Sequence, residues 1–271
     1  MRIAITRPVP ESLARCELTH LARVPIDHAL AAAEHAQYEE ALRSLGCSVR
    51  HVPAAHDLPD SVFVEDVALV LDDVAVVTRP GAESRRAECA TVAAVLGDYR
   101  PLRAIVSPGT VDGGDVLRIG RTLYVGLSTR TNADGADQLA RLAAPHGYQV
   151  VCVETAACLH LKSAATTLDS NHVLANPDWI DVDVFRSAGI EVIGVDPSEP
   201  HAANVLRIGR TLIAAASHAR TTALLQSHGY DVTVVDVSEL AKAEAGVTCC
   251  SLIVEASSFP LSAASSPASE H

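Results

Sequence analysis

The chain has 271 residues, and its 33 acidic residues against 21 lysines and arginines give a formal net charge of −12. Hydrophobic residues make up 48% of it and charged residues 20%, the balance of a globular protein with a sizeable core. Its acidity gives no general attraction for nucleic acid or anionic lipid, and its apolar runs are shorter than a bilayer span. We therefore expect no nucleic-acid or membrane partner, whereas a cationic small molecule remains compatible with this charge.

The N-terminus and the cysteines indicate a reducing compartment. The opening segment MRIAITRPVP lacks the apolar core of a signal peptide. The seven cysteines are odd in number, and outside the adjacent pair Cys249-Cys250 they show no metal-ligand spacing. The sequence therefore favours a cytoplasmic protein over a secreted one.

In chain order, the predicted elements repeat as hairpin, helix and strand. The octapeptide VLRIGRTL occurs twice, at Val116–Leu123 and Val205–Leu212, with the apolar alternation and Gly-containing tip of a β-hairpin. Two weaker relatives, Asp66–Thr78 and Ser163–Asn176, have the same pattern. Helical stretches lead into β-branched strands, which are predicted at Cys47–Val52, Leu102–Ser107, Gln149–Glu154, Glu191–Asp196 and Asp231–Asp236.

The fifth unit joins the two ends of the chain, with a strand at Ile3–Thr6 and another at Ser251–Glu255. Glycines stand where a helix would end in the left-handed conformation, at Gly46, Gly147, Gly189 and Gly229. A spacing of roughly 40–50 residues predicts a closed α/β ring of five small sheets, since one unit alone cannot bury its apolar face. An open α/β sheet would explain the alternation of elements but not the repeated octapeptide. We expect one domain over residues 1–256 and a disordered Ser/Pro/Ala-rich tail over residues 257–271.

Three segments contain candidate catalytic groups. Cys249 and Cys250 lie side by side before the last strand, where they could be a reactive thiol with a buried neighbour, a vicinal disulfide or a transient zinc site. His160 lies between apolar neighbours at a strand-to-hairpin junction, where a histidine satisfied by the backbone is the simpler interpretation. Asp112-Gly113-Gly114-Asp115 resembles a turn, yet the second octapeptide copy lacks these glycines, so the hairpin does not require them.

Charged residues form two further groups. Asp60, Glu65 and Asp66 surround the start of an apolar strand, either as a solvated cap or as carboxylates that hold a planar cation such as guanidinium. Arg85 and Arg130 each lie at a hairpin-to-helix junction, either as surface caps or as partners for a carboxylate. Carboxylates and arginines in one site would suit an arginine-like zwitterion with an additional cationic end.

The motifs in combination resemble one known family. The segments FVED (63–66), TRPG with SRR (78–86), DGGDVL (112–117), LSTRTN (127–132), LHLKS (159–163) and TCCS (248–251) closely resemble the dimethylarginine dimethylaminohydrolase family. That family belongs to the guanidino-group modifying (pentein) superfamily, built as a five-bladed α/β propeller. The resemblance covers residues 1–256 and agrees with the fivefold repeat.

The resemblance implies a role for each matching residue. Cys249 corresponds to the nucleophile, His160 to the general acid and base, and Asp112 to the carboxylate that orients the histidine. The substrate-binding positions correspond to Asp60, Glu65 and Asp66 for the guanidinium, Arg85 and Arg130 for the α-carboxylate, and the main chain of Leu18 and Ala243 for the amino group. Arg15–Leu21 resembles the family's mobile lid.

The implied reaction is hydrolysis of an Nω-methylated arginine to citrulline and methylamine or dimethylamine, through a covalent thiouronium intermediate. It implies no cofactor and no metal, and we expect a monomer or homodimer. Carboxylates near Cys249 disfavour its thiolate, so we hypothesise a neutral resting thiol that ionises when the cationic substrate binds.

Other functions remain open at this point. An arginine deiminase or an amidinotransferase would share the superfamily, although those chains are longer. A non-catalytic propeller would not need Cys249, His160 and Asp112 together. A thiol redox or zinc protein would use the adjacent cysteines.

Overall fold

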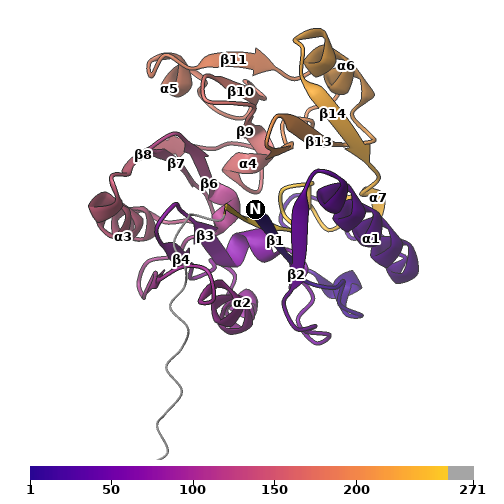
Figure 1. Ribbon diagram of the computed structural model, residues 1–271, viewed down its shortest axis with the longest axis vertical. Coiled ribbons are helices and arrows are strands. Elements are labelled where there is room, and N and C mark those ends of the chain that lie inside the picture. Colours follow the sequence, from indigo (N-terminus) through magenta and orange to yellow (C-terminus); the bar gives the residue numbers. More distant parts are fainter. Residues whose placement is uncertain (256–271) are drawn as a thin grey trace, which may run out of the picture.

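The computed structural model describes residues 1–255 and arranges its strands as five three-stranded sheets around a common axis (Figure 1). The predicted closed ring is therefore confirmed. The predicted tail at residues 257–271 lies outside the described residues. In order along the chain, the strands are β1 (Arg2–Thr6), β2 (Cys47–His51), β3 (Ala68–Val70), β4 (Ala75–Val77), β5 (Leu102–Ala104), β6 (Val116–Ile119), β7 (Thr122–Leu127), β8 (Gln149–Glu154), β9 (Ala165–Thr167), β10 (His172–Ala175), β11 (Glu191–Gly194), β12 (Leu206–Ile208), β13 (Thr211–Ala215), β14 (Asp231–Val235) and β15 (Leu252–Glu255).

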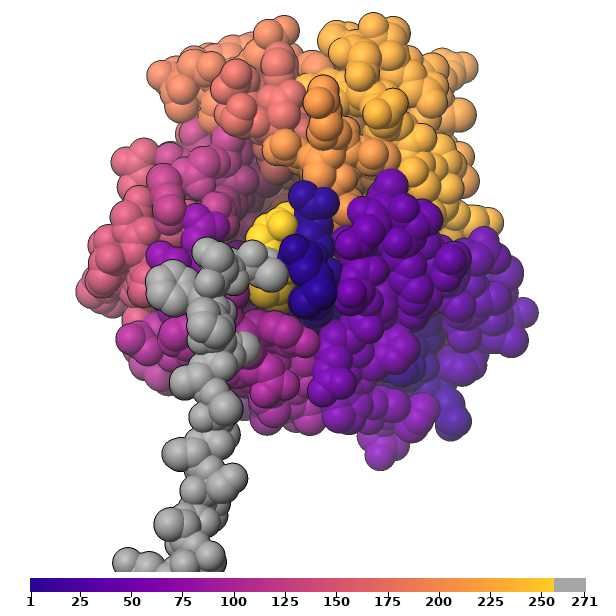
Figure 2. Space-filling view, in the orientation of Figure 1, coloured from indigo at the N-terminus to yellow at the C-terminus, as the bar shows by residue number. Residues whose placement is uncertain are grey.

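Every sheet has the same topology. A middle strand pairs antiparallel with one neighbour and parallel with the other, in the orders β15-β1-β2, β3-β4-β5, β6-β7-β8, β9-β10-β11 and β12-β13-β14. The two octapeptides form equivalent hairpins, with Leu117 opposite Tyr124 in one and Leu206 opposite Ile213 in the other. The ring closes where β1 pairs with β15, so the first and last strands lie side by side near the centre (Figure 2).

Helices connect each middle strand to its parallel neighbour and lie at the periphery of the ring (Figure 1). They are α1 (His28–Ser44), α2 (Cys89–Leu96), α3 (Ala133–Ala143), α5 (Asp183–Arg186) and α6 (Ala219–Ser227). The predicted glycine ends are confirmed, since Gly46 and Gly147 have φ values of 85° and 77°, a conformation that glycine adopts without steric cost. The remaining helical segments are the short turns η1 (Leu13–Arg15), η2 (Val64–Val67), η3 (Glu83–Glu88), η4 (Gly113–Asp115), η5 (Ala144–His146), α4 (Leu161–Ala164) and α7 (Ser238–Ala241).

Two strands end two or three residues before their predicted ends, while β2, β14 and β15 are each one residue shorter than predicted. The segment predicted as Leu102–Ser107 is a strand only as far as Ala104, and the segment predicted as Glu191–Asp196 only as far as Gly194. Each ends because its parallel partner ends, β4 at Val77 and β10 at Ala175. The hydrogen-bonded partner, and not the local apolar pattern, sets the strand length.

The core consists of aliphatic clusters between neighbouring sheets. One joins Ile5 of β1, Leu252 of β15 and Val92 of α2, all at most 5% exposed. Another contains the edge-to-face pair Tyr124 and Phe185, with ring centroids 4.8 Å apart. Among residues 1–255, no helix has both the length and the hydrophobicity needed to cross a membrane.

Candidate active site

Four sheets each bring one segment to the axis, immediately before the first strand of their hairpin. These segments are η2 before β3, η4 before β6, His160 with α4 before β9, and Thr248–Ser251 before β15. Because the sheets repeat around the axis, residues far apart in the sequence occupy equivalent places and meet at the centre. The fold therefore gathers the motifs that the sequence singles out.

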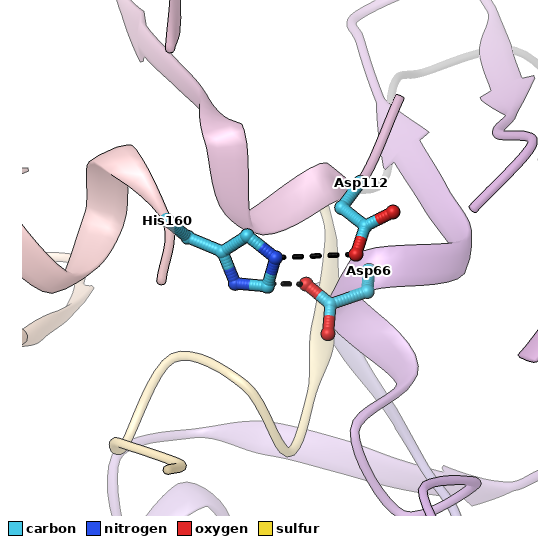
Figure 3. A group of neighbouring side chains, drawn as sticks. All are labelled: Asp66, Asp112 and His160. Atoms are coloured by element: carbon cyan, nitrogen blue, oxygen red, sulfur yellow. Dashed lines mark hydrogen bonds and ion pairs between the residues drawn. The ribbon is translucent and has the colours of Figure 1, made fainter. Parts of the chain in front are cut away.

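His160 lies between two buried carboxylates (Figure 3). Its Nε2 is 3.1 Å from Oδ2 of Asp112, and its Nδ1 is 3.7 Å from Oδ1 of Asp66. Burial by itself would lower the pKa of His160, but the charges of Asp66, Asp115 and Asp112 outweigh it and raise the pKa to about 9. The imidazole is therefore cationic at neutral pH and ready to donate a proton.

Asp115 is a functional residue that the sequence argument did not single out. It is fully buried and accepts hydrogen bonds from the backbone N–H of Leu161 at 3.0 Å and from the hydroxyls of Ser128 and Thr131 at 2.6 and 2.7 Å. It thereby fixes the first residue of α4, directly after His160. Burial raises the pKa of Asp115 to about 6. In the sequence, the position of Asp115 in the Asp-Gly-Gly-Asp motif could have identified it as a site residue.

Close approach of neighbouring segments explains the two glycines of that motif. A Cβ at Gly113 would lie 1.9 Å from the carbonyl oxygen of Glu65. One at Gly114 would lie 2.6 Å from Nδ1 of His160 and 2.7 Å from Oδ1 of Asp66. The backbone N–H of Gly114 instead donates to that Asp66 oxygen at 3.0 Å. The glycines are therefore required by the packing of the site and not by the hairpin.

Cys249 is half-buried at the axis, and its Sγ accepts a hydrogen bond from the backbone N–H of Gly246 at 3.3 Å. Burial, followed by the charges of Glu65 and Asp66, raises the pKa of the Cys249 thiol to about 12. The thiol is therefore neutral at rest, as the sequence argument hypothesised. Cys250 is buried in the core beside it, and both side chains are free thiols.

Most of the predicted residues surround one small cavity of about 20 Å³. Of the predicted set, those that line it are Asp60, Asp66, Arg85, Arg130, His160, Ala243 and Cys249. Asp112 stands directly behind His160, and its other oxygen, Oδ1, accepts from the backbone N–H of Gly81 at 2.9 Å. Thiol, imidazolium, carboxylates and arginines thus share one pocket.

Two predicted residues are already paired within the protein. Glu65 does not line the small cavity; it accepts from Lys162 Nζ at 2.7 Å and from the Thr248 hydroxyl at 2.6 Å, and it borders a separate cavity of about 220 Å³. Arg85 is 3% exposed and pairs with Asp66 at 2.5 Å and with Glu88 at 2.9 Å. The partners Lys162 and Glu88 were not predicted as site residues.

Arg130 and Asp60 contact the segment that follows η1. One guanidinium nitrogen of Arg130 donates to the Thr19 hydroxyl at 3.1 Å, and Asp60 accepts from the backbone N–H of Glu17 at 3.1 Å. Burial raises the pKa of Asp60 above its ordinary value. Leu18 lies between these two contacts and is half-buried, but it is not among the cavity's lining residues.

The ligand atoms of Asp66, Asp112 and His160 lie within 4.8 Å of one another, close enough to hold a metal ion. A metal ligand must be a neutral imidazole, however, whereas the carboxylates around His160 raise its pKa and favour the protonated ring in the metal-free site. Both nitrogens face carboxylates in the structure. The donor chemistry of this group therefore fits proton transfer better than metal binding.

The fold and these side chains define a class: a pentein-type propeller whose axial groups suit a cysteine hydrolase. The family model described as "N,N dimethylarginine dimethylhydrolase, eukaryotic" matches residues 22–251. The N(G),N(G)-dimethylarginine dimethylaminohydrolase of Streptomyces coelicolor is 43% identical over 92% of this chain and 95% of its own length. The chain therefore belongs to the dimethylarginine dimethylaminohydrolase family.

Solved structures agree with this assignment. A mutant dimethylarginine dimethylaminohydrolase of Pseudomonas aeruginosa, complexed with citrulline, is 34% identical with a TM-score of 0.88, over 93% of this chain and 98% of that one. The N-terminal domain of ArgZ, a cyanobacterial arginine dihydrolase, has a TM-score of 0.85 at 18% identity over 93% and 98% of the two chains. At that identity, the second match supports the fold alone.

Proposed function

We propose that this protein hydrolyses Nω-methylated arginines, asymmetric dimethylarginine and monomethylarginine, to L-citrulline and dimethylamine or methylamine. One observation carries the proposal: Cys249 and His160 line the same axial cavity, together with carboxylates for a guanidinium and an arginine for a carboxylate. Family membership supports the same reaction, since the relative from S. coelicolor has that name. We propose further that the protein acts in the cytoplasm, as a monomer or homodimer.

The charges around the cavity suit the two ends of such a substrate. Asp66 holds its carboxylate beside His160 because Arg85 and the Gly114 N–H both donate to it, and it serves the guanidinium together with Asp60. Within the described residues, Thr19 is the single hydrogen-bond partner of the Arg130 guanidinium, which therefore retains donors for the substrate α-carboxylate. The predicted main-chain contacts of Leu18 and Ala243 would receive the amino group. Arg85 is paired with Asp66 and Glu88, and Glu65 is paired with Lys162. These two residues therefore contribute to the net charge of the site and do not bind the substrate directly.

The first half of the reaction forms the covalent intermediate. Binding of the guanidinium beside Asp66 offsets the negative charge that opposes ionisation of Cys249, and the thiol releases its proton to solvent, because His160 already carries its own. The thiolate attacks the guanidinium carbon, forming the C–S bond and a neutral tetrahedral adduct. His160 gives its proton to the methylated nitrogen, the C–N bond breaks, and the free amine leaves a cationic thiouronium.

The second half regenerates the enzyme. His160 is now neutral and takes a proton from water, whose hydroxide adds to the thiouronium carbon. The C–S bond then breaks and its electron pair returns to the sulfur. The added hydroxyl passes its proton to the sulfur, which restores the neutral thiol, and the carbon becomes the ureido carbonyl of citrulline. Asp112 holds Nε2 of His160 throughout and stabilises each cationic state of the imidazole.

Parallel assays of dimethylarginine, monomethylarginine and arginine test the substrate assignment. We expect citrulline from both methylated substrates, with a stoichiometric amount of the corresponding methylamine. Arginine should give citrulline and ammonia far more slowly. Faster turnover of arginine than of either methylated substrate would contradict the proposal and would indicate an arginine deiminase.

A further inference from the structure

A segment without helix or strand lies at the edge of the catalytic cavity. The lid segment, defined here as residues 17–25, runs between η1 and α1, and most of its residues are exposed. At its start, Glu17 lines the cavity. The free space beneath is about 20 Å³, room for roughly one water molecule. A substrate of arginine size therefore requires lining residues to move, Glu17 among them.

The carboxylate of Glu244 holds three successive backbone amides of the lid segment. Its Oε2 accepts from the N–H of Thr19 at 3.0 Å, and its Oε1 accepts from those of His20 and Leu21, each at 2.5 Å. Hydrogen bonds to a charged acceptor are the stronger kind, and successive N–H groups of a loop form a concave anion-binding arrangement. The arrangement is thus an anion site of the lid that the protein fills with its own side chain.

The backbone at Glu244 is unusual. Its φ is 60°, in the left-handed region that residues with a Cβ seldom adopt. Such a conformation costs free energy and persists where surrounding contacts favour it. The three bonds to the lid are such contacts, since they depend on the direction in which this backbone presents the side chain.

The contacts of Glu244 and Asp60 bracket Leu18. Glu17 is held by Asp60, Thr19 is held by Glu244, and Leu18 lies between them. Ala243 directly precedes Glu244 in the chain and lines the cavity. One side chain therefore ties together the two segments whose main chain is proposed to receive the substrate amino group.

We propose that Glu244 is a positioning residue: it latches the lid segment over the site and fixes the main chain of Leu18 against that of Ala243, so that together they bind the substrate amino group. The role in binding the amino group rests on the proposed function, whereas the latch rests only on the hydrogen bonds of Glu244. Glu244, Ala245 and Leu159 also line a neighbouring cavity of about 500 Å³, together with His20 and Leu21 of the lid. The latch is thus part of the wall between the two cavities, and its release joins them while substrate enters.

Hydrogen exchange in the substrate-free protein tests the latch directly. Glu244→Gln keeps the length of the side chain but loses the charge and one acceptor oxygen, and Glu244→Ala removes all three bonds. We expect amide exchange at residues 19–21 to accelerate at least tenfold in Glu244→Ala and less in Glu244→Gln. Glu40→Gln, at an exposed glutamate of α1, is the matched control and should leave this exchange unchanged. Unchanged exchange in both Glu244 variants would overturn the latch.

Steady-state kinetics test the positioning role. With dimethylarginine, Glu244→Gln should raise KM about tenfold and change kcat less than about twofold, because binding contacts weaken while the reacting groups stay in place. Glu244→Asp keeps the charge and should recover part of the loss. A freed lid with unchanged KM would refute the positioning role. If the wild type turned over no methylarginine, the proposed function would fail, while the exchange result would still decide the latch.

Discussion

At the scale of single residues, the resting site differs from a preformed thiolate–imidazolium pair, because its imidazole is charged but its thiol is not. His160 is cationic, because three carboxylates outweigh its burial, and Cys249 is a neutral thiol, because burial and two carboxylates oppose its charge. A thiolate waiting at rest would react with many electrophiles. This arrangement instead couples formation of the nucleophile to arrival of a cation.

Alkylation of Cys249 by iodoacetamide measures this coupling. In the free protein the rate should rise with pH up to an apparent pKa above 9, because the thiol pKa is raised to about 12. Saturating acetamidine, a small cation, should lower that apparent pKa by at least one unit. A Cys250→Ser variant should behave alike, since Cys250 is buried behind the nucleophile. An apparent pKa below 7 in the free protein would refute the neutral-thiol account.

The carboxylate of Asp112 offers a second test at this scale. Asp112→Asn removes the charge that stabilises the imidazolium and presents an amide to Nε2 of His160. We expect kcat for citrulline formation to fall by about 10⁴, the loss seen when the acid of a Ser-His-Asp triad is neutralised. The acid limb of the kcat profile should also shift to lower pH. A kcat within threefold of wild type would contradict the role of Asp112.

At the scale of elements, short helical turns before the inner strands decide the geometry of the site. The sequence made the hairpins and helices visible through repeats, periodicity and glycines. It did not predict η2, η4 or α4, because turns of three or four residues have no periodicity. It also missed Asp115 and Glu244, whose partners lie in other segments of the chain. Contacts across the axis join segments that are distant in the sequence, so a single sequence does not predict them.

Gly114 in η4 tests the tight packing of these turns. Gly114→Ala places a Cβ 2.6 Å from His160 and 2.7 Å from Asp66, so both must shift. We expect kcat/KM to fall more than tenfold and the free energy of unfolding to fall by about 1–3 kcal/mol.

The tip of the hairpin that follows η4, between β6 and β7, supplies the matched control. Gly120→Ala has no neighbouring atom within 4 Å but a φ of 59°, so it should cost about 1 kcal/mol of stability and leave kcat/KM unchanged. Equal activity of the two variants would show that η4 tolerates a side chain and would refute the packing argument.

At the scale of the whole molecule, the ring brings equivalent segments of its five sheets to one axis. The location of most site residues at that axis follows from the repeat. Cys249, His160, Asp112 and Asp66 all precede inner strands, and the repeat places such positions at the centre. The resemblance assigned chemistry to them. The symmetry does not predict which charged side chains are neutralised by other residues of the protein. Arg85, which is paired with Asp66 and Glu88, is an example.

The charge on His160 links the site to the stability of the ring. Its folded pKa of about 9 exceeds the ordinary value of 6.5, so its contribution is fully present below pH 6.5 and is lost as the pH rises through 9. The shift corresponds to on the order of 3 kcal/mol. The free energy of unfolding is measured by denaturant for the wild type and for His160→Gln at pH 6 and pH 10. Titratable groups that both proteins share contribute equally and cancel in the comparison. We expect the wild type to lose more stability between these pH values than the variant; parallel losses would contradict the linkage.

The central claim is that Cys249 carries the substrate carbon as a covalent intermediate on the way to citrulline. Acid quenching of the enzyme during turnover of dimethylarginine, followed by peptide mass spectrometry, tests it most directly. We predict a thiouronium adduct, the substrate less dimethylamine, on the peptide containing Cys249. Cys249→Ser should show neither the adduct nor citrulline, and Cys250→Ser should show both. Citrulline formed by Cys249→Ser at a rate near that of the wild type would contradict the account.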